Sequence, residues 1–299
     1  MKIAETFTSS LHVRVRYYIY QPKVVLRVKG IVQIYHGRGE HADMYEHFAR
    51  YLLDNGFVVV VSDIVGHGQS LLDFEQGYFG DEKGIDFLIK DMEKLQRIIR
   101  SRFDEAPFFM LGVDLGSLLV RKYMNQHGDY VEGALLLGTL AKIKYSWIKK
   151  LYFNLMSLLK SPTYKKPTYR SLFHRGHNIK SDHWYSDDEE ANVDYLNDPM
   201  RNFIYTTQGY RDMLSVIDDV NGEVAMQQTP KYISLYMGCG KNDKLASGID
   251  KLAQKYKNLG IQDFTYHIFE NCGHTLIFDN SKKDVYKDIL KWLNERTYL

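Results

Sequence analysis

The stretch that decides the fold is "APFFMLGVDLGSLLVRKYM", residues 106–124. Its apolar run at 107–111 predicts a buried strand, "GVDLG" at 112–116 predicts a tight turn, and 117–124 predicts a helix. A strand, a G-x-S-x-G turn and a helix in this order form a nucleophile elbow, which lifts a serine above a sheet. The middle residue of this turn is Asp114. The stretch therefore predicts an elbow that carries a carboxylate where a hydroxyl is expected.

Strands and helices alternate on both sides of this elbow. Apolar patterns predict further strands at 11–20, 24–35, 57–61, 131–137, 232–237 and 264–269, and helices at 45–55, 85–103, 248–259 and 282–293. The continuous run "FVVVV" at 57–61 is typical of a strand covered on both faces. Repeated β-α-β units predict an α/β fold, with a mostly parallel central sheet flanked by helices.

Residues 140–225 interrupt the alternation with helical and loop character. We expect them to form a helical cap inserted over the carboxyl ends of the strands, so that the core consists of 1–139 and 226–299. The cap carries ten Lys and Arg and no acid over 141–180, and only acidic charges over 182–198. Apolar residues such as Trp147 and Leu155 lie in the basic part. Either the lid contacts an anionic membrane surface transiently and admits an acyl chain, or its helix packs on the core with solvated lysines.

Composition excludes several classes of function. A formal net charge of +2 over 299 residues gives no electrostatic case for nucleic-acid binding. No signal-peptide pattern and no apolar stretch of bilayer length is present, and Cys239 and Cys272 do not make a disulfide framework. We expect a cytoplasmic protein with reduced thiols, peripheral to a membrane if the lid binds one.

Two further chemical groups follow predicted strands. Asp243 lies in "LYMGCGKNDKL" and His274 in "NCGHTLIF". With Asp114 they stand in the order nucleophile, acid, histidine, which α/β-hydrolases use. Each could be an unrelated loop residue, but three matches in this order predict a catalytic triad.

An oxyanion hole is predicted from two backbone N–H groups. "YHGRGEH", residues 35–41, follows a strand and corresponds to the loop that supplies one of them. We expect the N–H of Arg38 and the N–H of Leu115 to form the pair. His36 and Gly37 are expected to support this loop rather than to react.

At this point the chain resembles the monoacylglycerol lipase/lysophospholipase branch of the α/β-hydrolases, also grouped with serine aminopeptidase S33-type hydrolases. "HGRGEHADMYEHFARYLLDNGFVVVVSDIVGHGQS" is similar to the HG-x-x-EH and D-x-x-GHG-x-S motifs of that branch, and the likeness runs from about residue 9 to 297. The resemblance implies a hydrolase of small-molecule esters with one fatty acyl chain, working without metal or cofactor. The family elbow usually has the sequence G-H-S-M-G, so Val113, Asp114 and Leu115 depart from it.

Asp114 disfavours acyl transfer. A carboxylate that attacks an ester is the better leaving group, since its conjugate acid has a pKa near 4, and the intermediate returns to reactants. At a helix N-terminus Asp114 should be ionised, should partly fill the oxyanion hole, and should raise the pKa of His274 together with Asp243. Ser117 and Ser70 are poor substitutes, because Ser117 should point away from the histidine and Ser70 ends another loop.

Three hypotheses follow. The first, which we favour, is a lipid monoester hydrolase scaffold whose serine was replaced, by evolution or on purpose, with an elongated apolar pocket for one acyl chain. The second is an Asp-nucleophile enzyme of epoxide-hydrolase type, since a carboxylate does attack saturated carbon. Such an enzyme needs a donor for the leaving oxygen, and the cap offers the tyrosines Tyr145, Tyr152, Tyr185, Tyr205 and Tyr210. The third is a non-catalytic acyl-chain binder.

Overall fold

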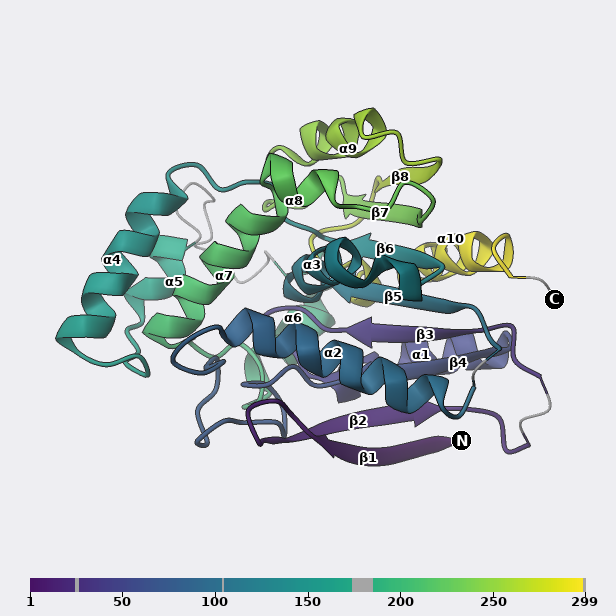
Figure 1. The fold of residues 1–299 in the computed structure, drawn as a ribbon, viewed down its shortest axis with the longest axis horizontal. Coiled ribbons are helices and arrows are strands. Elements are labelled where there is room, and N and C mark those ends of the chain that lie inside the picture. The colour runs from purple at the N-terminus through teal and green to yellow at the C-terminus, as the bar shows by residue number, and fades with distance from the viewer. Residues whose placement is uncertain (25–26, 104, 174–184, 298–299) are drawn as a thin grey trace.

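The computed structural model of the chain describes residues 1–24, 27–103, 105–173 and 185–297. Within them an eight-stranded sheet has the order β1-β2-β4-β3-β5-β6-β7-β8 (Figure 1). From β4 across to β8 all neighbours are parallel, whereas β1 pairs antiparallel with β2, and β2 antiparallel with β4. The strands are β1 (Lys2–Thr8), β2 (Arg14–Tyr20), β3 (Gly30–Tyr35), β4 (Phe57–Ser62), β5 (Phe108–Val113), β6 (Gly133–Leu137), β7 (Ser234–Gly240) and β8 (Asp263–Phe269).

Helices cover both faces of this sheet. The core helices are α1 (Glu46–Asp54), α2 (Gly84–Arg100), α3 (Leu115–His127), α9 (Ile249–Asn258) and α10 (Lys282–Asn294). Short 3-10 turns lie at Ala42–Tyr45, Gly128–Tyr130 and Leu276–Phe278. The predicted α/β-hydrolase fold, a mostly parallel sheet between helices, is confirmed.

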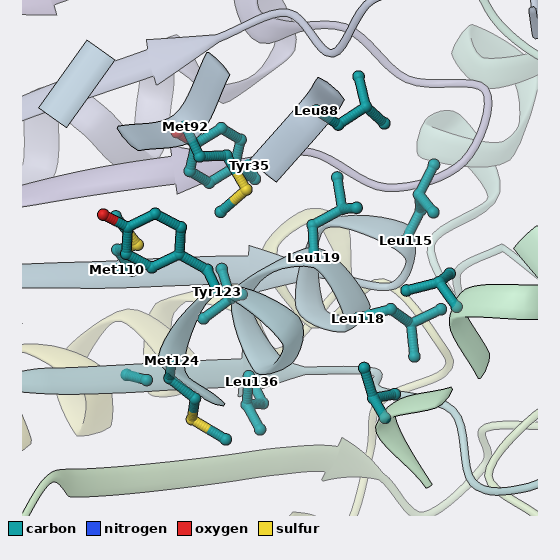
Figure 2. Packing of buried hydrophobic residues seen from close by; sticks show 14 of the residues in the cluster. Tyr35, Leu88, Met92, Met110, Leu115, Leu118, Leu119, Tyr123, Met124 and Leu136 are labelled. Carbon is teal, nitrogen blue, oxygen red and sulfur yellow. The ribbon is translucent and has the colours of Figure 1, made fainter. Parts of the chain in front are cut away.

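The central strands divide the core into two apolar layers. Along β5, Phe108 and Met110 join the layer under α2 and α3, whereas Phe109 and Leu111 join the layer under α1 and α10. Successive side chains of a strand point to opposite faces, so an all-apolar strand fills both layers at once. Figure 2 shows Leu119 and Tyr123 of α3 within the first layer, beside Met110 and the α2 residues Leu88 and Met92.

The N-terminal part differs from the prediction. Of the predicted strand at 24–35, residues 30–35 form β3, residues 27–29 are not in a strand, and residues 25–26 lie outside the described part of the chain. β1 was not predicted from its mixed polar sequence "KIAETFT". Strands β2 and β3 follow one another in the described part of the chain but are not neighbours in the sheet, because β2 pairs with β1 and β4. The polar edge strand β1 is stabilised by its pairing with β2, which the pattern of β1 alone does not encode.

Between β6 and β7 the described residues form helices and no strand. These are α4 (Ser146–Leu159), α5 (Thr168–Phe173), α6 (Glu189–Asn197), α7 (Thr207–Val220) and α8 (Glu223–Gln227). In Figure 1, α4, α5 and α7 stand together beyond the end of the sheet toward which β3 points. The stacked rings of Phe153 in α4 and Tyr210 in α7, 5.3 Å apart, join two of them. The division into a core and a 140–225 cap remains a prediction.

Candidate active site

The elbow turn between β5 and α3 holds Asp114 in a conformation that few side chains adopt. Its backbone has φ 45° and ψ −109°, and a non-glycine residue at positive φ is uncommon and often strained. Two glycines make the turn: a Cβ on Gly112 would collide with the backbone of Gly116, and a Cβ on Gly116 would collide with the Tyr35 carbonyl oxygen. The Asp114 side chain is therefore presented at the carboxyl end of β5.

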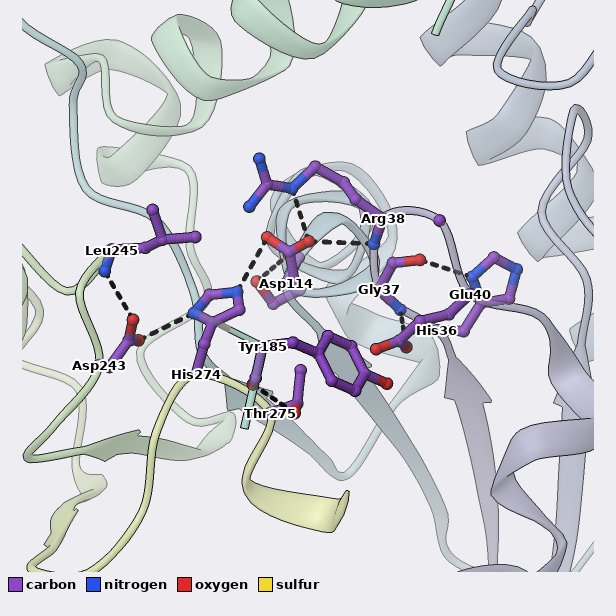
Figure 3. Close-up of polar contacts among 12 residues, drawn as sticks. His36, Gly37, Arg38, Glu40, Asp114, Tyr185, Asp243, Leu245, His274 and Thr275 are labelled. Atoms are coloured by element: carbon purple, nitrogen blue, oxygen red, sulfur yellow. Dashed lines mark hydrogen bonds and ion pairs between the residues drawn. The ribbon is translucent and has the colours of Figure 1, made fainter. Parts of the chain in front are cut away.

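Four groups of alternating charge form one buried chain at this end of the sheet (Figure 3). The Arg38 guanidinium donates from Nε to Asp114 Oδ2 over 2.6 Å. Asp114 Oδ1 lies 3.4 Å from His274 Nε2, and His274 Nδ1 lies 2.9 Å from Asp243 Oδ2. All four side chains are at most 7% exposed. The structure thus brings together the three residues predicted as a triad and adds a cation.

The backbone of Arg38 also bonds to Asp114. Its N–H donates to Asp114 Oδ2 over 3.0 Å. Leu115, the other predicted donor, is the first residue of α3, and amides of a first helical turn have no acceptor in their own helix. The Arg38 N–H, which was predicted to bind the oxyanion of the substrate, therefore already binds a carboxylate oxygen of Asp114.

Electrostatics in this chain favour an ionised Asp114 and a protonated His274. Burial by itself raises the pKa of Asp114, but the positive charges of Arg38 and His274 lower it well below its usual range. Burial likewise lowers the pKa of His274, but the Asp243 and Asp114 carboxylates outweigh it and raise that pKa to about 10. A histidine that is charged at neutral pH is a poor general base.

Each predicted loop-supporting residue makes buried contacts. His36 Nε2 accepts a hydrogen bond from the Ile64 N–H over 2.9 Å, and its Nδ1 lies 2.9 Å from the Gly37 carbonyl oxygen. The Gly37 N–H donates to Glu40 Oε2 over 2.7 Å. The bond between His36 and Ile64 links the loop after β3 to the loop after β4.

The two alternative serines point elsewhere. Ser117 Oγ donates to the Asp114 carbonyl oxygen over 2.5 Å, and Ser70 Oγ donates to Asp63 Oδ2 over 3.1 Å. Neither hydroxyl contacts His274, so neither replaces the missing nucleophile.

A small cavity adjoins Arg38 under the helical region. It measures about 20 Å³ and is lined by Arg38, Gly39, Arg170, Tyr195, Phe203, Tyr205, Tyr210 and Met213. This space suits a water molecule rather than an acyl chain. The elongated pocket that the sequence predicts is not formed by these lining residues.

Sequence reasoning missed two features of the site. Arg38 was predicted only as a backbone donor, yet its side chain pairs with Asp114. Tyr205 was one of several cap tyrosines, yet its hydroxyl accepts a hydrogen bond from the Gly39 N–H over 2.9 Å. The sequence signal for the Arg38–Asp114 pair was an arginine in the loop after β3 together with a carboxylate at the elbow. The role of Tyr205 had no comparable signal, because the chain has 23 tyrosines.

Comparison with known proteins identifies the family. The family model described as serine aminopeptidase, S33 (Hydrolase_4) matches residues 27–281. The chain belongs to this family. It is 23% identical over 270 residues to a Schizosaccharomyces pombe protein that carries a provisional monoglyceride lipase name, a match that spans 88% of this chain and 66% of the relative. Human monoglyceride lipase is 28% identical over 115 residues, which is 38% of this chain and 35% of that lipase. The matches thus span less than two thirds of the length of either relative.

Solved structures share the fold. A thermostable carboxyl esterase from Bacillus coagulans superposes with a TM-score of 0.88 at 24% identity, covering 98% of both chains. A soluble variant of Saccharomyces cerevisiae monoglyceride lipase gives 0.79 at 17% identity, covering 99% of this chain and 96% of that one. Among the described helices of the S33 chain, none has the length and apolar character needed to cross a membrane.

Proposed function

We propose that this chain is a carboxylic-ester hydrolase scaffold for small-molecule lipids with one acyl chain, in which Asp114 suppresses acyl transfer. One observation carries the proposal: Asp114 Oδ2 takes hydrogen bonds from both the N–H and the Nε–H of Arg38. An ester oxyanion would need the same amide, so the carboxylate competes with the transition state for its stabilising donor. The proposed ester hydrolysis uses neither a metal ion nor a cofactor, and no nucleic acid takes part in it.

Two chemical arguments support suppression. A tetrahedral intermediate on Asp114 would expel the carboxylate in preference to an alkoxide. The raised pKa of His274, about 10, also removes the base that would activate water or an alcohol at neutral pH. Membership of the family supports ester hydrolysis as the reaction class, and the Asp114 carboxylate suppresses the acyl-transfer step.

Restoring the serine tests the proposal. Asp114→Ser should raise hydrolysis of p-nitrophenyl and glyceryl monoacyl esters from near background by about 10⁴-fold, the effect typical of one triad member. Asp114→Ala is the matched control, because it removes the same carboxylate without supplying a nucleophile. Strong esterase activity in the unchanged chain, or none in Asp114→Ser with intact lipid binding, would contradict the proposal; the second result would favour the non-catalytic binder.

One observation favours a second candidate, an Asp-nucleophile enzyme that opens epoxides. Because Oδ2 is held by Arg38, Oδ1, which faces His274 Nε2 at 3.4 Å, is the oxygen that would attack a saturated carbon, and the tyrosines Tyr205 and Tyr210 line the adjoining cavity. A raised His274 pKa disfavours its second step, hydrolysis of the alkyl ester by activated water. Mass spectrometry of the unchanged chain after incubation with an epoxide tests it: an alkyl adduct on Asp114 would support this candidate, and an unmodified protein with unreacted epoxide would reject it.

A lipid-facing surface belongs to the same proposal. Trp147, Leu151, Leu155 and Leu158 follow one another along α4 at helical spacing and are 52–85% exposed, whereas Phe153 packs against α7. α4 carries Lys149 and Lys150, and the region 141–173 has eight basic residues and no acidic one. An apolar helix face bordered by lysines suits the interface of an anionic membrane. We place the chain in the cytoplasm, where the buried thiols of Cys239 and Cys272 stay reduced.

Vesicle sedimentation tests this surface. Leu155→Asp with Leu158→Asp should weaken binding to phosphatidylserine-containing vesicles at least about tenfold, since each change removes apolar burial and adds repulsion. Val224→Asp is the control, because Val224 is 75% exposed and lies on α8, outside this face. Equal binding by the double variant and the control would contradict the proposal.

A further inference from the structure

The loop that carries the Arg38 amide is held by a segment far away in sequence, residues 198–205, which follows α6 in the predicted cap. The Gly39 N–H donates to Tyr205 Oη over 2.9 Å, and the Gly39 carbonyl oxygen accepts from the Asn202 N–H over 3.2 Å. A third contact joins His41 Nε2 to Asp198 Oδ2 at 3.0 Å. We propose that the 198–205 segment positions the oxyanion amide, so that this donor is aligned only when the segment is docked. The catalytic meaning of the alignment depends on the proposed function, whereas the contacts themselves do not.

Tyr205 is the central residue of this arrangement. Its hydroxyl lies 2.6 Å from His67 Nε2, and His67 is fully buried in the loop "DIVGHGQS" after β4. Burial lowers the pKa of His67 to about 4, so its imidazole is neutral at pH 7. His67 Nδ1 lies 3.4 Å from the Val65 carbonyl oxygen, which can only accept, so in the neutral ring Nδ1 carries the proton and Nε2 accepts from the Tyr205 hydroxyl. The Tyr205 hydroxyl therefore accepts one hydrogen bond from the loop that carries Gly39 and donates one to the loop that carries His67, so it joins the two loops.

The close approach of loop and segment leaves little freedom. Gly39 has φ +62°, and a Cβ there would lie 2.9 Å from Tyr195 Oη and 3.1 Å from the Asn202 nitrogen. Glycine is the residue that allows both the positive φ and this contact. The segment is in turn fixed to the core, because Thr206 Oγ1 donates to the Gly77 carbonyl oxygen over 3.0 Å.

These bonds act on the amide through the backbone. The peptide group between Gly37 and Arg38 contains the oxyanion donor, and the next peptide group contains the N–H that binds Tyr205. Because a planar peptide leaves only two rotatable bonds per residue, fixing the second group restricts the direction of the first. Gly37 is restrained on the other side by Glu40. Undocking of 198–205 would release one of these two restraints, which makes Tyr205 a positioning residue rather than a catalytic one.

Hydrogen exchange tests these contacts without any need for activity, in variants that keep Asp114. Tyr205→Phe keeps the buried ring and removes the hydroxyl, so the Gly39 amide should exchange about 5- to 10-fold faster. Asp198→Ala should accelerate exchange in the same loop. Tyr236→Phe is the matched control, because its hydroxyl is bound to Asp288 outside the site. Exchange in 37–41 that equals the control in both variants would overturn the proposal.

Kinetics in the Asp114→Ser background test the catalytic consequence. Adding Tyr205→Phe should lower kcat for a monoacyl ester about tenfold or more with KM within twofold, since a misaligned oxyanion donor weakens only the transition state. Tyr236→Phe should change neither parameter. A raised KM with unchanged kcat would assign Tyr205 to substrate binding and overturn the positioning role. If Asp114→Ser itself lacks activity, the proposed function fails, and the exchange experiment still decides whether the segment holds the loop.

Discussion

Removing the charge of Asp114 should convert His274 from an imidazolium into a neutral imidazole. The isosteric change Asp114→Asn does this without supplying a nucleophile. In the unchanged chain the pKa of His274 is raised to about 10, so about one molecule in a thousand holds a neutral His274 at pH 7. The Asp114 carboxylate is one of the two groups responsible, and its Oδ1 is 3.4 Å from Nε2.

The size of the effect follows from this distance. Two unit charges 3.4 Å apart attract by about 5 kcal/mol at an effective dielectric constant near 20. Since 1.36 kcal/mol corresponds to one pKa unit, losing the Asp114 charge should lower the pKa of His274 by about 3 to 4. The remaining Asp243 and the burial of the ring then leave the pKa near the ordinary range of imidazole, and a large fraction of His274 becomes neutral at pH 7.

A pH titration of the histidine ring signals by NMR measures this change directly. The chain has 11 histidines, so loss of one signal in His274→Gln assigns the resonance. Asp114→Asn should show His274 titrating several pH units lower than the unchanged chain while remaining inactive toward esters. A His274 that titrates near neutrality in the unchanged chain, or at the same pH in both proteins, would refute the electrostatic argument.

Three other predictions concern stability. Arg38→Met and Asp114→Asn should each lower the unfolding free energy by about 3–5 kcal/mol, because each removes one partner of the buried Arg38–Asp114 ion pair, whereas the double variant should recover most of it; urea unfolding measures this, and simple addition of the two losses would contradict it. Because the folded-state pKa of His274 is raised from 6.5 to about 10, its contribution to stability is complete below pH 6.5 and is lost as pH rises through 10; melting across this window should show a smaller loss in Asp114→Asn, and equal losses would contradict the assignment. Gly116→Ala should destabilise the fold by about 3 kcal/mol, since the new Cβ meets the Tyr35 carbonyl oxygen; an unchanged melting temperature would mean that the elbow can relax.

Much of the fold is determined locally and could be predicted from the sequence. The all-apolar runs of β4 and β5 must be covered on both faces, and the helical periodicity of α2 must bury one side, whatever their neighbours are. The glycines around Asp114 fix the sharp turn, because a side chain at either position would collide with backbone. Asp114, Asp243 and His274 follow β5, β7 and β8, and they come together because parallel strands end at one edge of the sheet.

The tertiary structure decided the properties that depend on long-range contacts. Arg38 and Asp114 are 76 residues apart in sequence, and whether that arginine points to solvent or to the elbow is set by the packing of the loop after β3. Tyr205 is one of 23 tyrosines, and only the docking of 198–205 distinguishes it by placing its hydroxyl on Gly39. The edge strand β1 likewise exists because β2 supplies its hydrogen bonds. Sequence patterns report what each segment must bury, but a charge's pKa and a hydroxyl's role depend on partners that are neighbours only after folding.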